Sequence, residues 1–201
     1  SEDTEKDPVW SLTEGRRATV ENAKKAADMG VDMIILTGNP GIGVSNHAIV
    51  HALNELKAAV GDRVILTAGK MHAAGVISEG GENILAENDV DAFIDAGADI
   101  LLLPAPGTVP GITMEYAHKL IARAHAKGAL AMTTIGTSQE GADEATIREI
   151  ALMCKMAGTD IHHLGDSGYT GIAIPENITA YSKVIRGTRH TYRRMALSVN
   201  R

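Results

Sequence analysis

Residues 159–171 hold the richest group of reactive side chains in this sequence. Two histidines, His162 and His163, follow a short apolar entry, and Asp166 and Ser167 come next among three glycines. Imidazole and carboxylate groups transfer protons near neutral pH and also bind divalent cations. The amides of a glycine-rich turn before a helix bind anions. The stretch therefore predicts an anion site with acid–base groups beside it.

Roles within this stretch follow from position. Because side chains alternate along a strand, only one of two neighbouring histidines faces a given side. His163 is the candidate acid–base residue, and Asp166 would orient it or share a divalent cation such as Mg²⁺ with it. The candidate phosphate ligands here are Gly165, Ser167 and Gly168. In the simpler alternative, His162 faces the core and the rest forms a tight turn.

A second polar group, Lys70 and His72, follows the apolar run that begins at Val64. A lysine at a strand end holds a phosphate or carboxylate as a point charge, or forms a Schiff base if it is desolvated. His72 would transfer a proton beside it. The alternative is a surface lysine with a solvated histidine. We take Lys70 and His72 as catalytic candidates.

Two further loops add hydroxyl and amide groups. The run after Met132 supplies four candidate phosphate ligands: Thr134, Gly136, Thr137 and Ser138. Asn39, in a loop after the first apolar run, is either a ligand donor or a turn residue. Glycine- and hydroxyl-rich loops after the last two strands match the usual phosphate position of a (β/α)₈ barrel.

These loops recur with a regular period. Glycines that end predicted helices fall at residues 30, 61, 97, 128 and 158, at intervals of 31, 36, 31 and 30. An apolar run follows each of them, at Val31–Leu36, Val64–Leu66, Ile100–Leu103, Leu130–Met132 and Ile161–Leu164. Such a period, with one strand and one helix in each unit, predicts a βα array with parallel strands. A helical pattern is also expected from Thr13 and from Pro175.

Five such units and one leading helix allow two architectures. The favoured one treats residues 1–201 as a single domain, the last five βα units of a (β/α)₈ TIM barrel whose first units are absent from this chain. It would leave two open sheet edges. The alternative is a five-stranded, doubly wound flavodoxin-like sheet with strand order 2-1-3-4-5.

Composition excludes several functions. The chain has 19 basic and 25 acidic residues and a net charge of −6, which is atypical of a nucleic-acid-binding protein. No apolar run approaches the roughly 18 residues of a membrane span. The single cysteine, Cys154, cannot form an internal disulfide and suits a cytoplasmic protein. The basic C-terminal residues, from Arg186 onward, predict a solvated helix face or a subunit contact, and we expect a homo-oligomer.

Two segments carry a resemblance to known families. Leu66–Gly75 and His163–Gly171 resemble an uncharacterised bacterial TIM-barrel family that is loosely labelled phosphoenolpyruvate phosphonomutase-like or haloacid dehalogenase-like. This resemblance implies the fold more than a reaction. His163–Gly168 is also similar to a late-strand loop of class II aldolases, which would make His163 a metal ligand. The metal-binding motif of the phosphonomutase and isocitrate lyase group is not recognisable here.

The sequence thus predicts an enzyme that acts on a small anionic, phosphorylated metabolite by lyase or isomerase chemistry beside a carbonyl. Lys70 would hold the anion or the carbonyl, and His72 or His163 would act as acid and base. Apart from a divalent cation, no cofactor is expected. Two alternatives stay open: a metal-assisted hydrolase that uses His163 and Asp166, and a non-catalytic subunit that senses a small molecule.

Overall fold

The computed structural model describes residues 13–38, 44–72, 80–137, 139–165 and 173–197. Its sheet has five parallel strands in the order β1-β2-β3-β4-β5. The strands are β1 (Met33–Leu36), β2 (Ile65–Gly69), β3 (Ile100–Pro104), β4 (Leu130–Thr134) and β5 (Ile161–His163). The predicted βα array with parallel strands is therefore confirmed.

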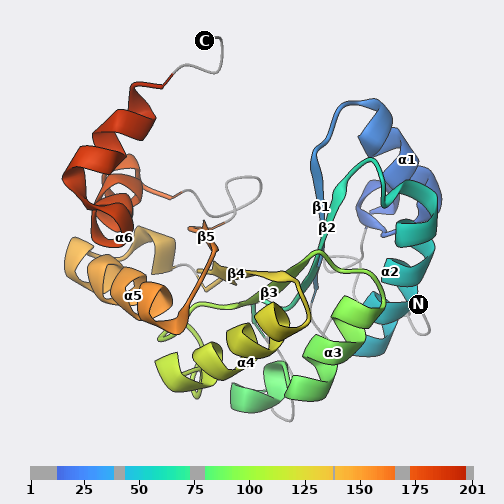
Figure 1. Cartoon of the computed structure of the whole chain (residues 1–201), viewed down its shortest axis with the longest axis horizontal. Helices are drawn as coiled ribbons and strands as arrows, with labels where there is room; N and C mark the ends of the chain where they lie inside the picture. The colour runs from blue at the N-terminus through green and yellow to red at the C-terminus, as the bar shows by residue number, and fades with distance from the viewer. Residues whose placement is uncertain (1–12, 39–43, 73–79, 138, 166–172, 198–201) are drawn as a thin grey trace.

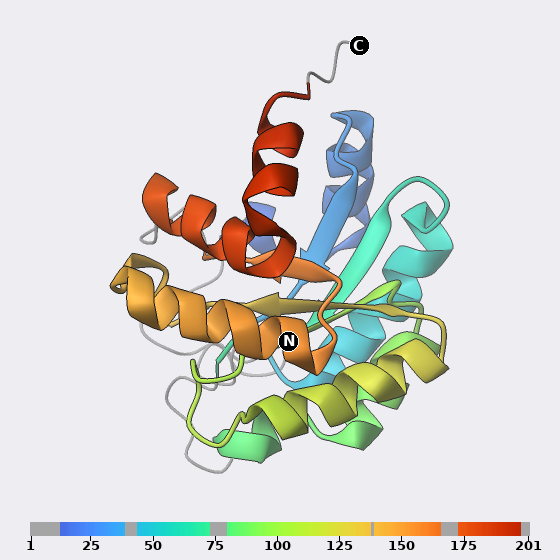
Figure 2. The same cartoon turned by 60° about the vertical axis from the view of Figure 1, so that its left-hand side comes forward.

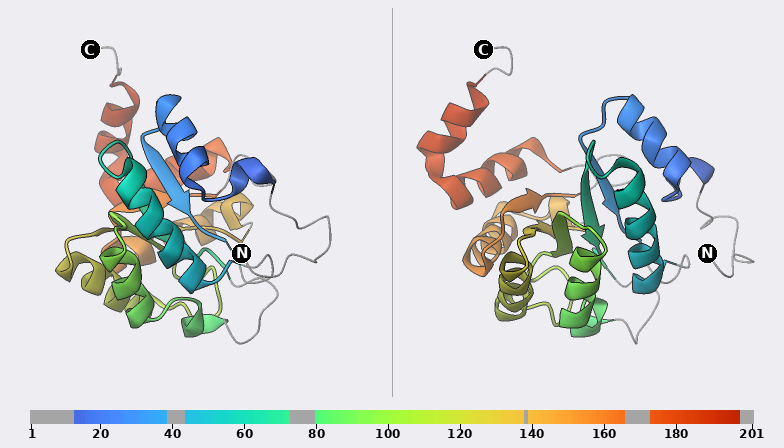
Figure 3. Two further views of the ribbon diagram at one scale, coloured as in Figure 1. Left: turned by 90° about the vertical axis from the view of Figure 1, so that its right-hand side faces the viewer. Right: turned by 45° about the vertical axis from the view of Figure 1, so that its right-hand side comes forward.

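Six α-helices accompany the strands in the described ranges: α1 (Val20–Asp28), α2 (Asn46–Val60), α3 (Glu87–Asp95), α4 (Met114–Ala126), α5 (Glu144–Ala157) and α6 (Pro175–Met195). Short 3₁₀ helices lie at Glu14–Arg16 (η1), Gly81–Ile84 (η4) and Gln139–Gly141 (η5). Helices α2 to α5 follow the convex side of the curved sheet, and α1 packs beside α2 (Figure 1 and Figure 3). The arrangement is a half-barrel.

The flavodoxin-like alternative is wrong, because its strand order would be 2-1-3-4-5. Here each strand pairs with the next in the chain, so every connection turns the same way around the sheet. That is how strands succeed one another in a barrel, whereas a doubly wound sheet reverses direction once.

The predicted element boundaries hold with local exceptions. Four of the five predicted helix-ending glycines have positive φ, whereas Gly61 has φ −61 and continues the right-handed turn after α2. The predicted helix from Thr13 is interrupted: η1 covers Glu14–Arg16, and α1 begins only at Val20, where Thr19 accepts a capping bond from Asn22 N–H.

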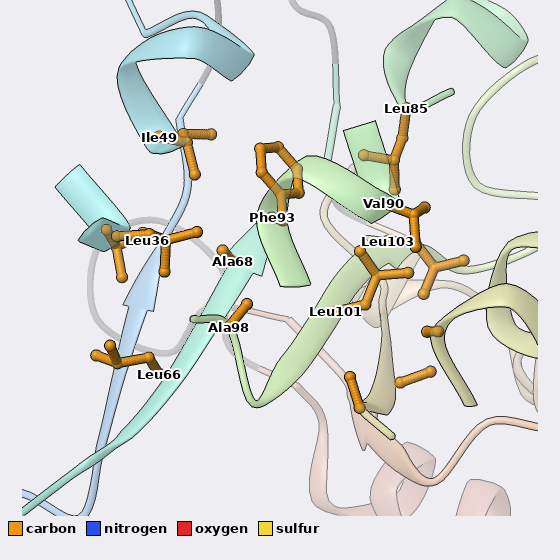
Figure 4. Packing of buried hydrophobic residues seen from close by; sticks show 14 of the residues in the cluster. Leu36, Ile49, Leu66, Ala68, Leu85, Val90, Phe93, Ala98, Leu101 and Leu103 are labelled. Carbon is orange, nitrogen blue, oxygen red and sulfur yellow. The ribbon is translucent and has the colours of Figure 1, made fainter. Parts of the chain in front are cut away.

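Alternate residues of each strand face the helices. Leu66, Leu101 and Leu103 point outward with Phe93 of α3, and all four side chains are fully buried (Figure 4). Burying an aliphatic or aromatic side chain contributes about 1.5–3 kcal/mol, so this outer layer holds the helices on the sheet.

The inner face carries a second, smaller apolar cluster. Ile100, Leu102 and Met132 are buried there, with Met33, Ile35, Met71 and Ile161 packed against them. Near the amino ends of the strands, Ile65 and Leu130 are 42% and 48% exposed. The inward face is therefore only partly covered.

Two aspartates fasten neighbouring strands at their beginnings. Asp99 Oδ2, before β3, accepts the amide of Leu66 at 2.9 Å. Asp160 Oδ2, before β5, accepts the amide of Ala131 at 2.8 Å and lies 2.7 Å from His125 Nε2. Both follow a positive-φ glycine by two residues.

Asp32, before β1, also follows such a glycine by two residues, at Gly30. Within the described ranges its exposed carboxylate accepts no hydrogen bond, since β1 has no strand on its other side. A residue equivalent to the two strand-fastening aspartates therefore stands at an open sheet edge.

Helix α6 leaves the body of the molecule in two halves. Its first half packs against α5, and Gly187, with φ 75 and ψ 162, separates it from the second half (Figure 2). None of the helices in the described ranges is long and apolar enough to cross a membrane.

Candidate functional site at the carboxyl ends of the strands

The carboxyl ends of β3, β4 and β5 lie in one row. Pro104 pairs in register with Thr134, and Thr134 pairs with His163. Thr134 and His163 are two residues beyond Met132 and Ile161, which belong to the inward cluster, so both face inward. This row forms the rim on which the predicted site residues are assembled.

Lys70 follows the last residue of β2 and is 1% exposed, the first among the largest fully buried side chains. Gly69, the residue before it, lies close to β3. A Cβ atom at Gly69 would lie 1.8 Å from the carbonyl oxygen of Leu102, and Gly69 has φ 156. The close approach of β2 to β3 therefore requires glycine directly before Lys70. The alternative of a surface lysine is wrong.

Met71 connects the loop after β2 with the loop after β4. A Cβ atom at Gly136 would lie 2.7 Å from Cβ of Met71. These loops follow strands that are not neighbours, because β3 lies between them. The loops therefore converge above β3, and Lys70 and Gly136 belong to the same part of the rim.

His163 is held through its Nδ1 atom. The amide of Gly165 donates to Nδ1 at 3.2 Å, and Oγ1 of the fully buried Thr134 lies 3.1 Å from it. Because an amide N–H can only donate, Nδ1 is an acceptor, and we assign the proton of the neutral ring to Nε2. His163 thus presents an Nε2–H donor that its backbone partner orients.

His162 faces the opposite side of the sheet. Its Nδ1 lies 2.8 Å from the hydroxyl of Tyr181 in α6, and the two rings meet edge to face. Burial, with a smaller contribution from the charge of Arg186, lowers the pKa of His162 to about 4. The expectation that the two histidines face different sides is confirmed, and His162 packs between β5 and α6.

His72 is half-buried, and this burial lowers its pKa from the ordinary value. An imidazole with a lowered pKa is neutral at pH 7, as a general base must be before it accepts a proton. Its place two residues after Lys70 keeps it on the same loop.

The hydroxyl group of Thr137 is already hydrogen-bonded to other groups of the protein. It lies 2.8 Å from Oε1 of Gln139 and 3.2 Å from the carbonyl oxygen of Thr108. The amide group of Gln139 donates to the carbonyl of Gly107 at 3.4 Å. These bonds tie the loops after β3 and β4 together, so the hydroxyl proton of Thr137 is already used.

Sequence reasoning missed two residues of this rim. Glu140 is 7% exposed and its stem packs against Gly165. Asn177, on α6, is 5% exposed and its amide group donates to the carbonyls of Glu140 and Ala142, both at 2.9 Å. Both depend on contacts between distant loops, which no local pattern reveals.

Five predicted site residues lie outside the described residues: Asn39, Ser138, Asp166, Ser167 and Gly168. The metal pair of His163 and Asp166 therefore stays a prediction. Among the residues that are described, no three His, Cys, Asp or Glu side chains gather as metal ligands would.

The geometry defines a class of protein, a parallel α/β half-barrel whose candidate site lies at the carboxyl ends of its strands. The chain belongs to the family described as "Domain of unknown function (DUF7916)", whose model matches residues 1–201. Comparison with curated proteins finds no match.

Solved structures share this fold. A "putative deoxyribose-phosphate aldolase" from Coccidioides immitis matches with TM-score 0.60 and 16% identity, over 85% of this chain and 62% of that one. A "putative lyase/mutase" from Burkholderia cenocepacia J2315 matches with TM-score 0.61 and 15% identity, over 84% and 63%. The tetrameric deoxyribose phosphate aldolase from Aeropyrum pernix matches with TM-score 0.50 and 13% identity, over 85% and 76%.

This chain therefore spans less than two thirds of the length of the first two structures. At these identities the likeness shows the fold alone. The lyase/mutase neighbour agrees in fold with the expected resemblance to a phosphonomutase-like barrel family.

Proposed function

We propose that this chain supplies five βα units of a (β/α)₈ barrel enzyme that performs lyase or isomerase chemistry beside a carbonyl of a small phosphorylated metabolite. The observation that carries the proposal is the burial of Lys70 at the carboxyl end of β2, on the rim that also holds His163. Barrel enzymes have their active sites at this face.

Asp32 supports completion of the barrel at the β1 edge. The aspartates at the same place before β3 and β5 each accept an amide of the preceding strand. An equivalent aspartate before β1 predicts a further parallel strand whose amide it would accept. In an eight-stranded barrel, the strands missing here would lie between the open edges of β1 and β5.

We assign a proposed role to the main candidate site residues that the structure describes. Lys70 holds the phosphate or carboxylate of the substrate, or binds its carbonyl carbon as a Schiff base. The Nε2–H group of His163 donates to an oxygen on which negative charge develops, and neutral His72 accepts the proton that leaves carbon. Gly136 offers a backbone amide, whereas the amide of Gly165 is already used, together with Thr134, to fix the ring of His163.

The neighbours' printed names support the reaction class, because an aldolase and a lyase/mutase share this fold. We extend the class to this chain as a proposal. The predicted ligands outside the described residues, Ser138, Ser167 and Gly168, would complete the phosphate site, and Asp166 would orient His163 or hold Mg²⁺. Self-association of the chain is part of the proposal.

Calorimetric titration with inorganic phosphate tests the anion site. We expect binding in the wild type and at least a tenfold weaker affinity in Lys70→Met. Lys25→Met is the matched control, because it removes the same charge from an exposed residue of α1 that pairs with Glu21. Equal phosphate affinity in Lys70→Met and Lys25→Met would remove Lys70 from the site.

A further inference from the structure

Glu140 is a buried carboxylate at this rim. It lies in η5, the 3₁₀ turn after β4, and 93% of its surface is buried. In the part of the chain that the structure describes, its carboxylate forms neither a hydrogen bond nor an ion pair. Burying a carboxylate is costly unless it is paired, so an unpaired one at this position requires a reason.

The stem of Glu140 lies flat against Gly165. A Cβ atom at Gly165 would be 2.9 Å from Cβ of Glu140, 2.8 Å from Cγ and 3.2 Å from Cδ. The amide of the same Gly165 donates to Nδ1 of His163. Glu140 and His163 therefore both contact Gly165, which places the two side chains on the same rim.

The loop that carries Glu140 is fixed by hydrogen bonds to other parts of the protein. The buried amide group of Asn177 binds the carbonyls of Glu140 and Ala142, and Gln139 binds the carbonyl of Gly107. The backbone position of Glu140 is thus fixed by α6 on one side and by the loop after β3 on the other. Such support is typical of a side chain that must keep its place without a partner of its own.

The remaining exposed surface of Glu140 includes its oxygens. Among the described residues these oxygens have no hydrogen-bond partner, yet they do not count among the fully buried polar atoms without one, so they keep some contact with solvent. The stem of Glu140 packs against Gly165, and its carboxylate keeps a small solvent-exposed surface. The carboxylate is therefore accessible to a ligand at the carboxyl ends of β4 and β5.

We propose that Glu140 contacts the ligand of this site and selects small anions that also carry a hydroxyl group. The proposal rests on the proposed function and defines its substrate class as hydroxylated phosphate monoesters. A carboxylate repels a bare phosphate nearby, whereas it accepts a strong hydrogen bond from a hydroxyl group. The phosphate would then lie toward Lys70, and the hydroxyl group would bind Glu140.

Titration with two probes, inorganic phosphate and glycerol 3-phosphate, tests this assignment. For the wild type we expect glycerol 3-phosphate to bind at least threefold more tightly than inorganic phosphate. Glu140→Gln keeps the shape and removes the charge, so inorganic phosphate should bind threefold to tenfold more tightly and the preference should disappear. Glu144→Gln is the control, because Glu144 is exposed on α5 and pairs with Arg148.

Glu140→Asp covers the case in which Glu140→Gln does not fold. It keeps the charge and withdraws the oxygens by one methylene group, so the preference for glycerol 3-phosphate should fall while phosphate affinity stays within twofold. Wild-type preference retained in Glu140→Gln, or in Glu140→Asp, would overturn the assignment. A folded wild type that binds neither probe would overturn the proposed function, and the substrate class with it.

Discussion

Replacing Asp99 by alanine tests whether the repeated aspartates fasten the strands. Asp99 Oδ2 accepts the amide of Leu66 at 2.9 Å, and its other oxygen lies 3.0 Å from Nζ of Lys57. A hydrogen bond to a charged group contributes about 1.5–3 kcal/mol. The ion pair adds about 0.2–1 kcal/mol, because both of its side chains are 41% exposed.

We therefore expect Asp99→Ala to lower the free energy of unfolding by about 2–4 kcal/mol. Asp32→Ala is the matched control. It changes an aspartate in the same position relative to its glycine and strand, but one whose carboxylate accepts no hydrogen bond within the described ranges. Its effect should stay within about 0.5 kcal/mol, as for ordinary surface substitutions.

Urea unfolding followed by far-ultraviolet circular dichroism measures both variants against the wild type. Equal losses in Asp99→Ala and Asp32→Ala, or no loss in Asp99→Ala, would refute the fastening role. If a further strand is supplied at the β1 edge, Asp32→Ala should become as costly as Asp99→Ala. That change would show that Asp32 accepts an amide of the added strand.

Three further predictions concern the rim and its support. Between pH 6.5 and 4 the free energy of unfolding should fall toward lower pH by up to about 1.4 kcal/mol per pH unit. The reason is that His162 has a pKa of about 4 in the folded protein and binds a proton more readily once unfolding exposes it. Urea unfolding at several pH values should show a smaller pH dependence of this free energy for His162→Gln. Gly69→Ala should cost about 1–3 kcal/mol, because its Cβ would lie 1.8 Å from Leu102 O, whereas Gly15→Ala, with no atom within 4 Å, should change the melting temperature little. Asn177→Ala should weaken binding of glycerol 3-phosphate severalfold in calorimetry while exposed Asn54→Ala does not; equal affinities would show that the loop needs no support from α6.

The repeat was predictable because each unit repeats the same local physics. A positive-φ glycine ends most helices, and an apolar run follows it to form the next strand. Gly61 is the exception, since its right-handed conformation could be adopted by other residues, and composition alone does not distinguish it from the rest.

The candidate site was predictable only in part. Lys70 and His163 stand directly at strand ends, where their position follows from the period of the repeat. The use of the Thr137 hydroxyl inside the protein depends on Thr108 and Gln139, and the burial of Glu140 depends on Gly165. These contacts join different loops, so they follow from the folded arrangement and not from any local spacing.

The choice between the barrel and the flavodoxin-like sheet was likewise predictable only in part. The interval between glycines predicts strand–helix units, but it is compatible with both orders of strands. The order 1-2-3-4-5 is decided by the pairing of β2 with β3, which the bond between Asp99 and Leu66 illustrates, because in the alternative order β2 would have β1 as its neighbour and not β3. Such pairings join residues about 30 positions apart.

A crystal structure of the chain soaked with inorganic phosphate tests the central claim most directly. The account predicts phosphate density at the carboxyl ends of the strands, within hydrogen-bonding distance of Nζ of Lys70 and on the side of the sheet that carries His163. Phosphate bound only at the amino ends or on the helical face, with Lys70 turned away from it, would contradict the account.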